Sequence, residues 1–253
     1  MGEYMQRYFI YEHNLITNNT ILIDEADSHH IKDVMRMHVG ENVIACIKGT
    51  NKIYLCKIEN ISKHVSLRIL EEKEENNELA IKVSIAHGLV KRDKQEEVIR
   101  RLVELGAYRY IPVAMDRSVI KLKKEEYKFK NDRLERIIKE ASEQAERNDF
   151  LILNDVLSFN DLVKSFNEYD LVLFAHARKK DDLSLKKYLN IDKSIKNILV
   201  IIGPEGGFSE KEENILFEND KVHTISLGKR VLRTETAPLA AMAILAFIGE
   251  NDE

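Results

Sequence analysis

The sequence is poor in cysteine: only Cys46 and Cys56 occur among its 253 residues. They lie ten residues apart in two segments that both look like strands, and no spacing typical of metal ligands surrounds them. A disulfide framework or a cysteine metal site needs more cysteines, in closer groups. We therefore expect two reduced cysteines within a sheet, and no metal site.

Long apolar runs are also missing. No run approaches the ~20 apolar residues of a membrane span, and Arg7 and Glu12 interrupt the N-terminal segment, unlike a signal peptide. We therefore predict a soluble, cytoplasmic protein with no membrane partner. Hydrophobic residues still make up 44% of the chain, which is enough for a core and excludes a disordered protein.

Two common nucleotide-binding motifs are absent as well. The chain has neither G-x-G-x-x-G after its first strand nor G-x-x-x-x-G-K-[ST], so dinucleotide redox and nucleoside triphosphate chemistry are disfavoured. The net charge of −4 argues against a non-specific polyanion binder. Residues 89–147 nevertheless carry 16 Lys and Arg against 12 Asp and Glu, which fits either a nucleic-acid contact or a pair of solvated, salt-bridged helices.

The first 70 residues or so predict a small β-rich module. Residues 43–47 and 53–58 are apolar runs joined by a Gly- and Asn-containing hairpin signal, and residues 65–69 alternate apolar and polar side chains. A helix is predicted over residues 29–37. The polar run 71–78 has no apolar residue to bury, so it is the predicted interdomain linker. We place the domains at residues 1–72 and 73–253.

The second part alternates strands with helices, which predicts a mostly parallel α/β sheet covered on both faces. Gly106 should end one helix, and Ser209 and Glu212 have capping-box spacing. The predicted strands are 81–87, 108–114, 170–177, 197–202 and 222–227; the predicted helices are 94–105, 133–147, one after Ser209, and 237–248.

Two segments at predicted strand ends, residues 203–207 (GPEGG) and 227–237 (LGKRVLRTETA), concentrate groups that a core does not need. Ligands bind at such strand ends in open α/β sheets. Each segment also has a structural explanation, since 203–207 suits any tight turn, and Thr234 or Thr236 suits a helix N-cap with the arginines solvated. The pairing of the two segments favours a ligand site.

Taken together, these segments resemble the signature of the RsmE-type ribosomal RNA methyltransferases of the SPOUT superfamily. Three further matches follow in the family's order: His30-Ile31 through Val34-Met35-Arg36-Met37, Glu104-Leu105-Gly106, and Glu143-Gln144 with Arg147. The resemblance therefore covers most of the chain.

The resemblance implies an N-terminal PUA-like β-barrel that binds RNA and a C-terminal SPOUT α/β domain with a deep trefoil knot. It implies a homodimer that uses S-adenosylmethionine to methylate N3 of one uridine, by convention position 1498, in the 16S rRNA of the small ribosomal subunit. Two alternatives stay open: a SPOUT methyltransferase acting on another RNA or on a ribose 2′-hydroxyl, and a non-catalytic RNA-binding assembly factor.

The resemblance also assigns the cofactor-binding residues. Glycines would let the backbone approach S-adenosylmethionine, and the second segment would line its adenine and ribose. The candidates are His176, Gly203, Glu205, Gly206, Gly207, Leu227, Gly228, Leu232, Thr234, Thr236 and Ala237.

Uridine N3 is a poor nucleophile until it loses its proton, so a cation near the uracil edge would stabilise the developing charge. Arg233 is the first candidate for this catalytic role and Arg230 the second, with Glu235 as a candidate proton acceptor. The candidate RNA-binding residues are Arg7, Arg36, Lys91, Arg92 and Lys94. The alanine-rich helix 237–248 is apolar nearly all round, so it should be buried in the core or in a dimer interface.

Overall fold

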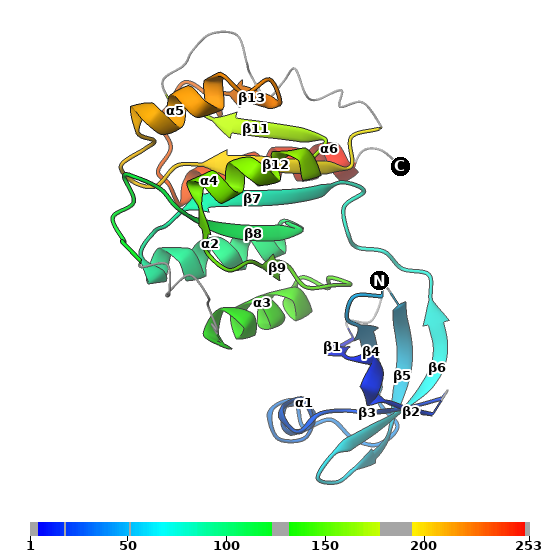
Figure 1. Cartoon of the computed structure of the whole chain (residues 1–253). Helices are drawn as coiled ribbons and strands as arrows, with labels where there is room; N and C mark the ends of the chain where they lie inside the picture. The colour runs from blue at the N-terminus through cyan, green and yellow to red at the C-terminus, as the bar shows by residue number, and fades with distance from the viewer. Residues whose placement is uncertain (1–4, 18, 51, 123–131, 178–193, 251–253) are drawn as a thin grey trace. The chain divides into compact units, whose positions relative to one another are not determined.

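The computed structural model describes residues 5–17, 19–50, 52–122, 132–177 and 194–250. The chain divides into two compact units (Figure 1). Unit 1 comprises Met1–Glu78 and Ser142–Phe150, and unit 2 comprises Leu79–Ala141 and Leu151–Glu253. Each unit has its own sheet and its own hydrophobic core.

Unit 1 is built on a curled sheet whose described strands have the order β1-β4-β5-β6-β3-β2. β1 and β4 pair in parallel, and the other neighbours are antiparallel. The strands are β1 (Arg7–Ile10), β2 (Leu15–Thr17), β3 (Thr20–Leu22), β4 (Asn42–Ile47), β5 (Lys52–Ile61) and β6 (Val65–Lys73). The predicted β-rich module is confirmed, and both free cysteines are buried on β4 and β5.

The helical part of unit 1 differs from the prediction. A 3-10 turn, η1 (Glu12–Asn14), precedes α1 (Glu25–His29), which continues as the π-helical turn η2 (His30–Val34). The predicted range 29–37 is therefore wrong at both ends. The helix begins earlier because the Asp24 side chain caps it, accepting a 2.8 Å hydrogen bond from the Asp27 N–H.

Unit 2 contains the parallel sheet that the sequence predicts. Its described strands have the order β10-β8-β7-β12-β11-β13, with β9 beside β8, and every pair is parallel. The strands are β7 (Lys82–Gly88), β8 (Arg109–Ala114), β9 (Ile152–Leu153), β10 (Leu157–Ser158), β11 (Leu171–Ala175), β12 (Asn197–Ile202) and β13 (Val222–Ile225). β12 is central and almost fully buried, as its continuous apolar run requires.

Helices cover both faces of this sheet (Figure 1). α4 and α5 pack over a core that includes Phe174, Leu199 and Phe208, while α6 packs against β7, β12 and α2. The capping box of Ser209 and Glu212 is confirmed at the start of α5. The helices are α2 (Arg92–Glu104), α3 (Asp132–Gln144), α4 (Phe159–Lys164), the 3-10 turn η4 (Ser165–Glu168), α5 (Glu210–Phe217) and α6 (Thr236–Glu250).

Helix ends agree with the sequence where a local signal exists. Gly106 has φ +81, the left-handed conformation expected of a residue that follows a helix. Pro238 lies in the first turn of α6, as predicted. α3 ends at Gln144 rather than at residue 147, because the chain turns at Glu146, whose φ is +53.

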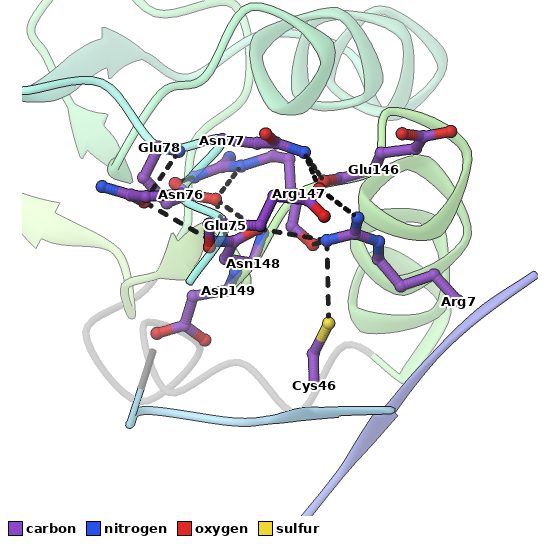
Figure 2. A network of polar contacts seen from close by, with 10 residues as sticks. All are labelled: Arg7, Cys46, Glu75, Asn76, Asn77, Glu78, Glu146, Arg147, Asn148 and Asp149. Atoms are coloured by element: carbon purple, nitrogen blue, oxygen red, sulfur yellow. Dashed lines mark hydrogen bonds and ion pairs between the residues drawn. The ribbon is translucent and has the colours of Figure 1, made fainter. Parts of the chain in front are cut away.

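A polar network around the buried Arg7 joins four separate segments of unit 1, as Figure 2 shows: Arg7, Cys46, residues 75–78 and residues 146–149. The guanidinium of Arg7 donates to Glu75 Oε1 at 2.8 Å, to Asn148 Oδ1 at 3.1 Å and to the Arg147 carbonyl at 3.3 Å. Arg7 is only 4% exposed, so each of these acceptors replaces water that the cation has lost.

The same network occupies the polar run that was predicted as a linker. Arg147 forms an ion pair with Glu78, whose Oε1 also accepts a 2.9 Å hydrogen bond from the Asn148 N–H. Asn77 donates to the Glu146 carbonyl at 2.8 Å (Figure 2). Residues 75–78 therefore hold the segment 146–149 in place through charged and amide groups.

We expect Arg7→Met to lower the free energy of unfolding by about 2–4 kcal/mol, because Asn148 and the Arg147 carbonyl would lose their buried donor. Urea unfolding followed by circular dichroism measures this loss. The matched control is Arg68→Met, which removes an exposed ion pair with Glu59 at a side chain that is 59% exposed. That change should cost less than about 1 kcal/mol. Equal losses in the two variants would show that the network does not support the fold.

Candidate functional site

The two motif segments lie at the same edge of the parallel sheet in unit 2. Residue 203 directly follows β12, and Ser226 directly follows β13. Because neighbouring strands are parallel, the carboxyl ends of β7, β11, β12 and β13 share one edge. The predicted placement of both segments at strand ends is confirmed.

A cleft opens between the ends of β11 and β13. One wall is the run Ala175, His176 and Ala177, and the other comes from the segment after β13, with Ala237 of α6 between them. The full lining is Ala175, His176, Ala177, Ser226, Leu227, Gly228, Arg230, Leu232 and Ala237. Apart from His176, Ser226 and Arg230, the lining side chains are small or aliphatic, which suits a flat heteroaromatic group flanked by backbone polar atoms.

Sequence reasoning names six of these lining residues and misses three. His176, Leu227, Gly228, Leu232 and Ala237 belong to the predicted cofactor set, and Arg230 to the predicted catalytic set. The missed residues are Ala175, Ala177 and Ser226. No chemical signal marks an alanine as a lining residue, and only its position beside His176 could have suggested it.

The glycines of residues 203–207 have packing reasons within the chain. A Cβ at Gly203 would come within 2.8 Å of the Phe208 ring, and one at Gly206 within 2.7 Å of the Arg117 carbonyl oxygen. Gly207 has φ +68, and its N–H donates to the Pro204 carbonyl at 2.9 Å. These contacts are those of a tight turn, and the predicted approach of this backbone to a cofactor stays a prediction.

A charged cluster lies on the same segments. The Lys94 ammonium contacts Glu235 Oε2 at 3.2 Å and Glu205 Oε1 at 3.4 Å. Glu235 is also 4.0 Å from the Arg233 guanidinium, whose side chain is 85% exposed. A hydrogen bond from its own backbone N–H, helped by Lys94, lowers the pKa of Glu235. Glu235 is therefore held ionised, and Arg233 extends into solvent.

The predicted RNA-binding residues are placed very differently from one another. Arg36 of unit 1 is exposed and has φ +52, a strained conformation for an arginine. Arg7 is buried in the network of Figure 2, which argues against its predicted contact with RNA. In unit 2, Lys91 and Arg92 are exposed at the start of α2, whereas the Lys94 ammonium faces two carboxylates.

A buried histidine that sequence reasoning did not single out contacts Thr234, whose hydroxyl joins the two motif segments. His87, at the end of β7, is fully buried, and its Nε2 is 2.9 Å from the Thr234 hydroxyl. That hydroxyl donates to the Gly203 carbonyl at 2.8 Å. The other ring nitrogen, Nδ1, is 3.0 Å from the Tyr110 hydroxyl. A histidine at the end of an apolar strand carries no sequence signal that distinguishes it from an ordinary core residue.

Burial lowers the pKa of His87 to about 4, against the opposing effect of a hydrogen bond with the Thr234 backbone. Burial also raises the pKa of Tyr110. Both groups are therefore neutral at neutral pH, and they interact through hydrogen bonds rather than through charge.

Among the described residues, no group of three or more His, Cys, Asp or Glu side chains could hold a metal ion. No helix in the described part of the chain is long and apolar enough to cross a membrane.

The pKa of His87 predicts a pH-dependent stability. Between the ordinary histidine pKa of 6.5 and about 4, the unfolded chain binds a proton at His87 that the folded protein does not. The free energy of unfolding should therefore fall as the pH falls through this window, by up to about 3 kcal/mol from this group. Urea midpoints between pH 6.5 and 4 should decline less steeply in His87→Gln than in the wild type. The control is His38→Gln at an 83% exposed side chain; equal slopes for wild type and His87→Gln would contradict the prediction.

Two family models match the chain. A family model described as an RNA methyltransferase domain matches residues 77–246, and one described as an RNA methyltransferase PUA domain matches residues 23–70. The chain is 39% identical over 249 residues to ribosomal RNA small subunit methyltransferase E of Bacillus subtilis, with 96% of each chain covered. It is 30% identical over 253 residues to the protein of the same name from Rickettsia conorii, covering 96% of this chain and 97% of that one.

Two similar solved structures contain S-adenosylmethionine. One is ribosomal RNA small subunit methyltransferase E of Neisseria gonorrhoeae, with a TM-score of 0.83, 25% identity, and 97% and 98% of the two chains covered. The other is a methyltransferase of Legionella pneumophila, with a TM-score of 0.82, 28% identity, and 96% and 97% covered. These likenesses confirm the predicted fold class, a PUA-like sheet followed by a SPOUT-type α/β sheet. The chain belongs to the RNA methyltransferase family represented by ribosomal RNA small subunit methyltransferase E.

Proposed function

We propose that this protein transfers the methyl group of S-adenosylmethionine to N3 of a single uridine, conventional position 1498, in the 16S rRNA of the small ribosomal subunit. One observation carries the proposal. In a chain 39% identical over its length to a small subunit rRNA methyltransferase, an apolar cleft opens at the carboxyl edge of the sheet, with Arg230 in its lining. The cytoplasm, where ribosomal subunits are assembled, is the proposed location.

The cleft suits the cofactor chemically. Leu227, Leu232 and Ala237 offer apolar contacts for the adenine ring, and Gly228, with φ +125, keeps side-chain atoms away from the opening. When bound, S-adenosylmethionine supplies an electrophilic methyl group on a sulfonium ion. The predicted contacts with Gly203, Glu205, Gly206, Gly207, Thr234 and Thr236 extend this site beyond the lining residues.

The chain's own residues would act on the uracil. Loss of the N3 proton leaves negative charge on the uracil edge, and a fixed cation stabilises that charge better than water does. Arg233, exposed and directly before Thr234, is our first candidate, and Arg230 of the cleft lining is the second. Glu235 is held ionised and can accept a proton, but its lowered pKa makes it a weak base. Catalysis would therefore depend mainly on positioning and charge.

RNA binding and assembly complete the proposal. The PUA-like domain, which the sequence predicts at residues 1–72 before the transfer domain at 73–253, would contact RNA through Arg36, and Lys91 and Arg92 would contact phosphates. We also propose a deep trefoil knot in the C-terminal SPOUT domain, and a homodimer. The outer face of α6 supports the homodimer, because Ala243 is exposed there and Phe247 is 65% exposed. Sedimentation velocity that gives only monomer would overturn the dimer.

The proposed function is tested by incubating the protein with radiolabelled S-adenosylmethionine and small subunits from a strain lacking the enzyme, followed by nucleoside analysis. We expect label in N3-methyluridine at one position. Label in a ribose-methylated nucleoside would instead support the 2′-hydroxyl alternative. Absence of both cofactor binding and transfer would favour the non-catalytic assembly factor.

Arg233→Ala should reduce turnover by about two to three orders of magnitude, because the uracil charge would lose the cation proposed to stabilise it. S-adenosylmethionine affinity and the melting temperature should change little, since the side chain is 85% exposed. Single-turnover assays and calorimetry measure these quantities. Arg100→Ala, at an exposed arginine of α2, is the matched control. Near-wild-type turnover in Arg233→Ala would remove this arginine from the mechanism.

A further inference from the structure

Four residues of unit 2 form one buried hydrogen-bonded chain. The hydroxyl of Tyr110 on β8 meets His87 Nδ1 at 3.0 Å. His87 Nε2 meets the Thr234 hydroxyl at 2.9 Å, and Thr234 donates to the Gly203 carbonyl at 2.8 Å. Each of the three side chains is at least nine-tenths buried, so water does not substitute for any of these bonds.

The direction of every proton in this chain follows from its Gly203 end, where a carbonyl can only accept. The single proton of the Thr234 hydroxyl points to this carbonyl. The Thr234 oxygen must therefore accept from His87, which places the ring proton on Nε2. Nδ1 then carries a lone pair and accepts from the Tyr110 hydroxyl. The opposite tautomer would leave the Thr234 hydroxyl facing two acceptors with one proton.

Thr234 is the buried residue of the segment 226–236. Among residues 226–236 it alone is buried; Gly228 to Val231 and Arg233 are exposed. The turn that starts α6 is built on the next residues, with the Thr236 and Ala237 N–H groups both donating to the Arg233 carbonyl at 2.9 Å. The position of Arg233 and of the cleft wall therefore depends on where Thr234 is held.

We propose that His87, as the neutral Nε2–H tautomer, is a positioning residue: it holds Thr234 against Gly203 and so fixes the cleft wall and Arg233. This role rests on the proposed methyltransferase function. His87 does not line the cleft, and it acts only through Thr234. A leucine of similar size would fill the same space but would leave the Thr234 oxygen without a donor.

The contrasting explanation is that His87 only fills the core. The two explanations differ in what they predict for Thr234, because a core-filling histidine would be indifferent to the threonine hydroxyl. They also predict different results for His87→Gln. Glutamine can donate a hydrogen bond to the Thr234 hydroxyl, but it lacks the ring that packs against Tyr110.

The test compares His87→Leu, His87→Gln, Thr234→Val and Thr234→Ser, with Tyr110→Phe as the control that keeps the bond between His87 and Thr234. We expect His87→Leu and Thr234→Val each to weaken S-adenosylmethionine binding at least tenfold by calorimetry and to lower kcat more than tenfold. Their double variant should be no worse than either single one. Thr234→Ser and His87→Gln should recover most of the affinity, and Tyr110→Phe should stay within about threefold of wild type.

Two outcomes would overturn the proposal. One is that His87→Leu lowers the melting temperature but leaves the S-adenosylmethionine affinity and kcat unchanged, both measured at a temperature at which the variant is folded. The other comes from nitrogen NMR of the wild-type protein at neutral pH: a charged ring, or a proton on Nδ1, contradicts the required tautomer. The NMR measurement needs neither cofactor nor RNA, so it is independent of the proposed function. If only the proposed function is wrong, the wild-type protein will be folded and show the expected tautomer but will transfer no methyl group.

Discussion

The hydroxyl of Thr234 forms the buried contact on which the candidate site depends. It joins the Gly203 carbonyl, 31 positions earlier in the chain, to His87, which is 147 positions earlier. Most of the segment after β13 is exposed and polar, so hydrophobic burial alone would hold it weakly. A donor, an acceptor and a buried ring therefore provide the rigidity that apolar packing does not supply there.

Unit 1 is also held together by polar contacts between distant segments, but there the contacts involve charged side chains. Arg7, Glu75 and Arg147 come from three separate parts of the chain, and the Arg7 guanidinium donates to Glu75 and to the Arg147 carbonyl (Figure 2). A buried cation is costly without such partners, so Arg7 depends on both of the segments that supply its acceptors. In both units, polar groups distant in sequence hold a segment that buries few of its side chains.

Local signals predicted the elements of the fold well. The apolar run of β12, the capping box of Ser209 and the helix-ending Gly106 all depend on neighbouring residues, and all three are confirmed. Errors arose where a distant or unnoticed contact sets the boundary, as at Asp24, which starts α1 four residues before the predicted helix, and at Glu146, where the chain turns out of α3. The order of the strands in the sheets has no local signal at all.

The sequence by itself determined that residues 203–207 and 227–237 follow strands and carry unusual chemistry, and its motifs placed the chain in an RNA methyltransferase family. Only the tertiary structure decided that Ala175 and Ser226 line the cleft, that Lys94 faces Glu205 and Glu235, and that Arg7 is buried. It also decided that His87 supports Thr234. The reason is physical: periodicity and capping act over a few residues, whereas burial and hydrogen-bond partners depend on which elements pack together.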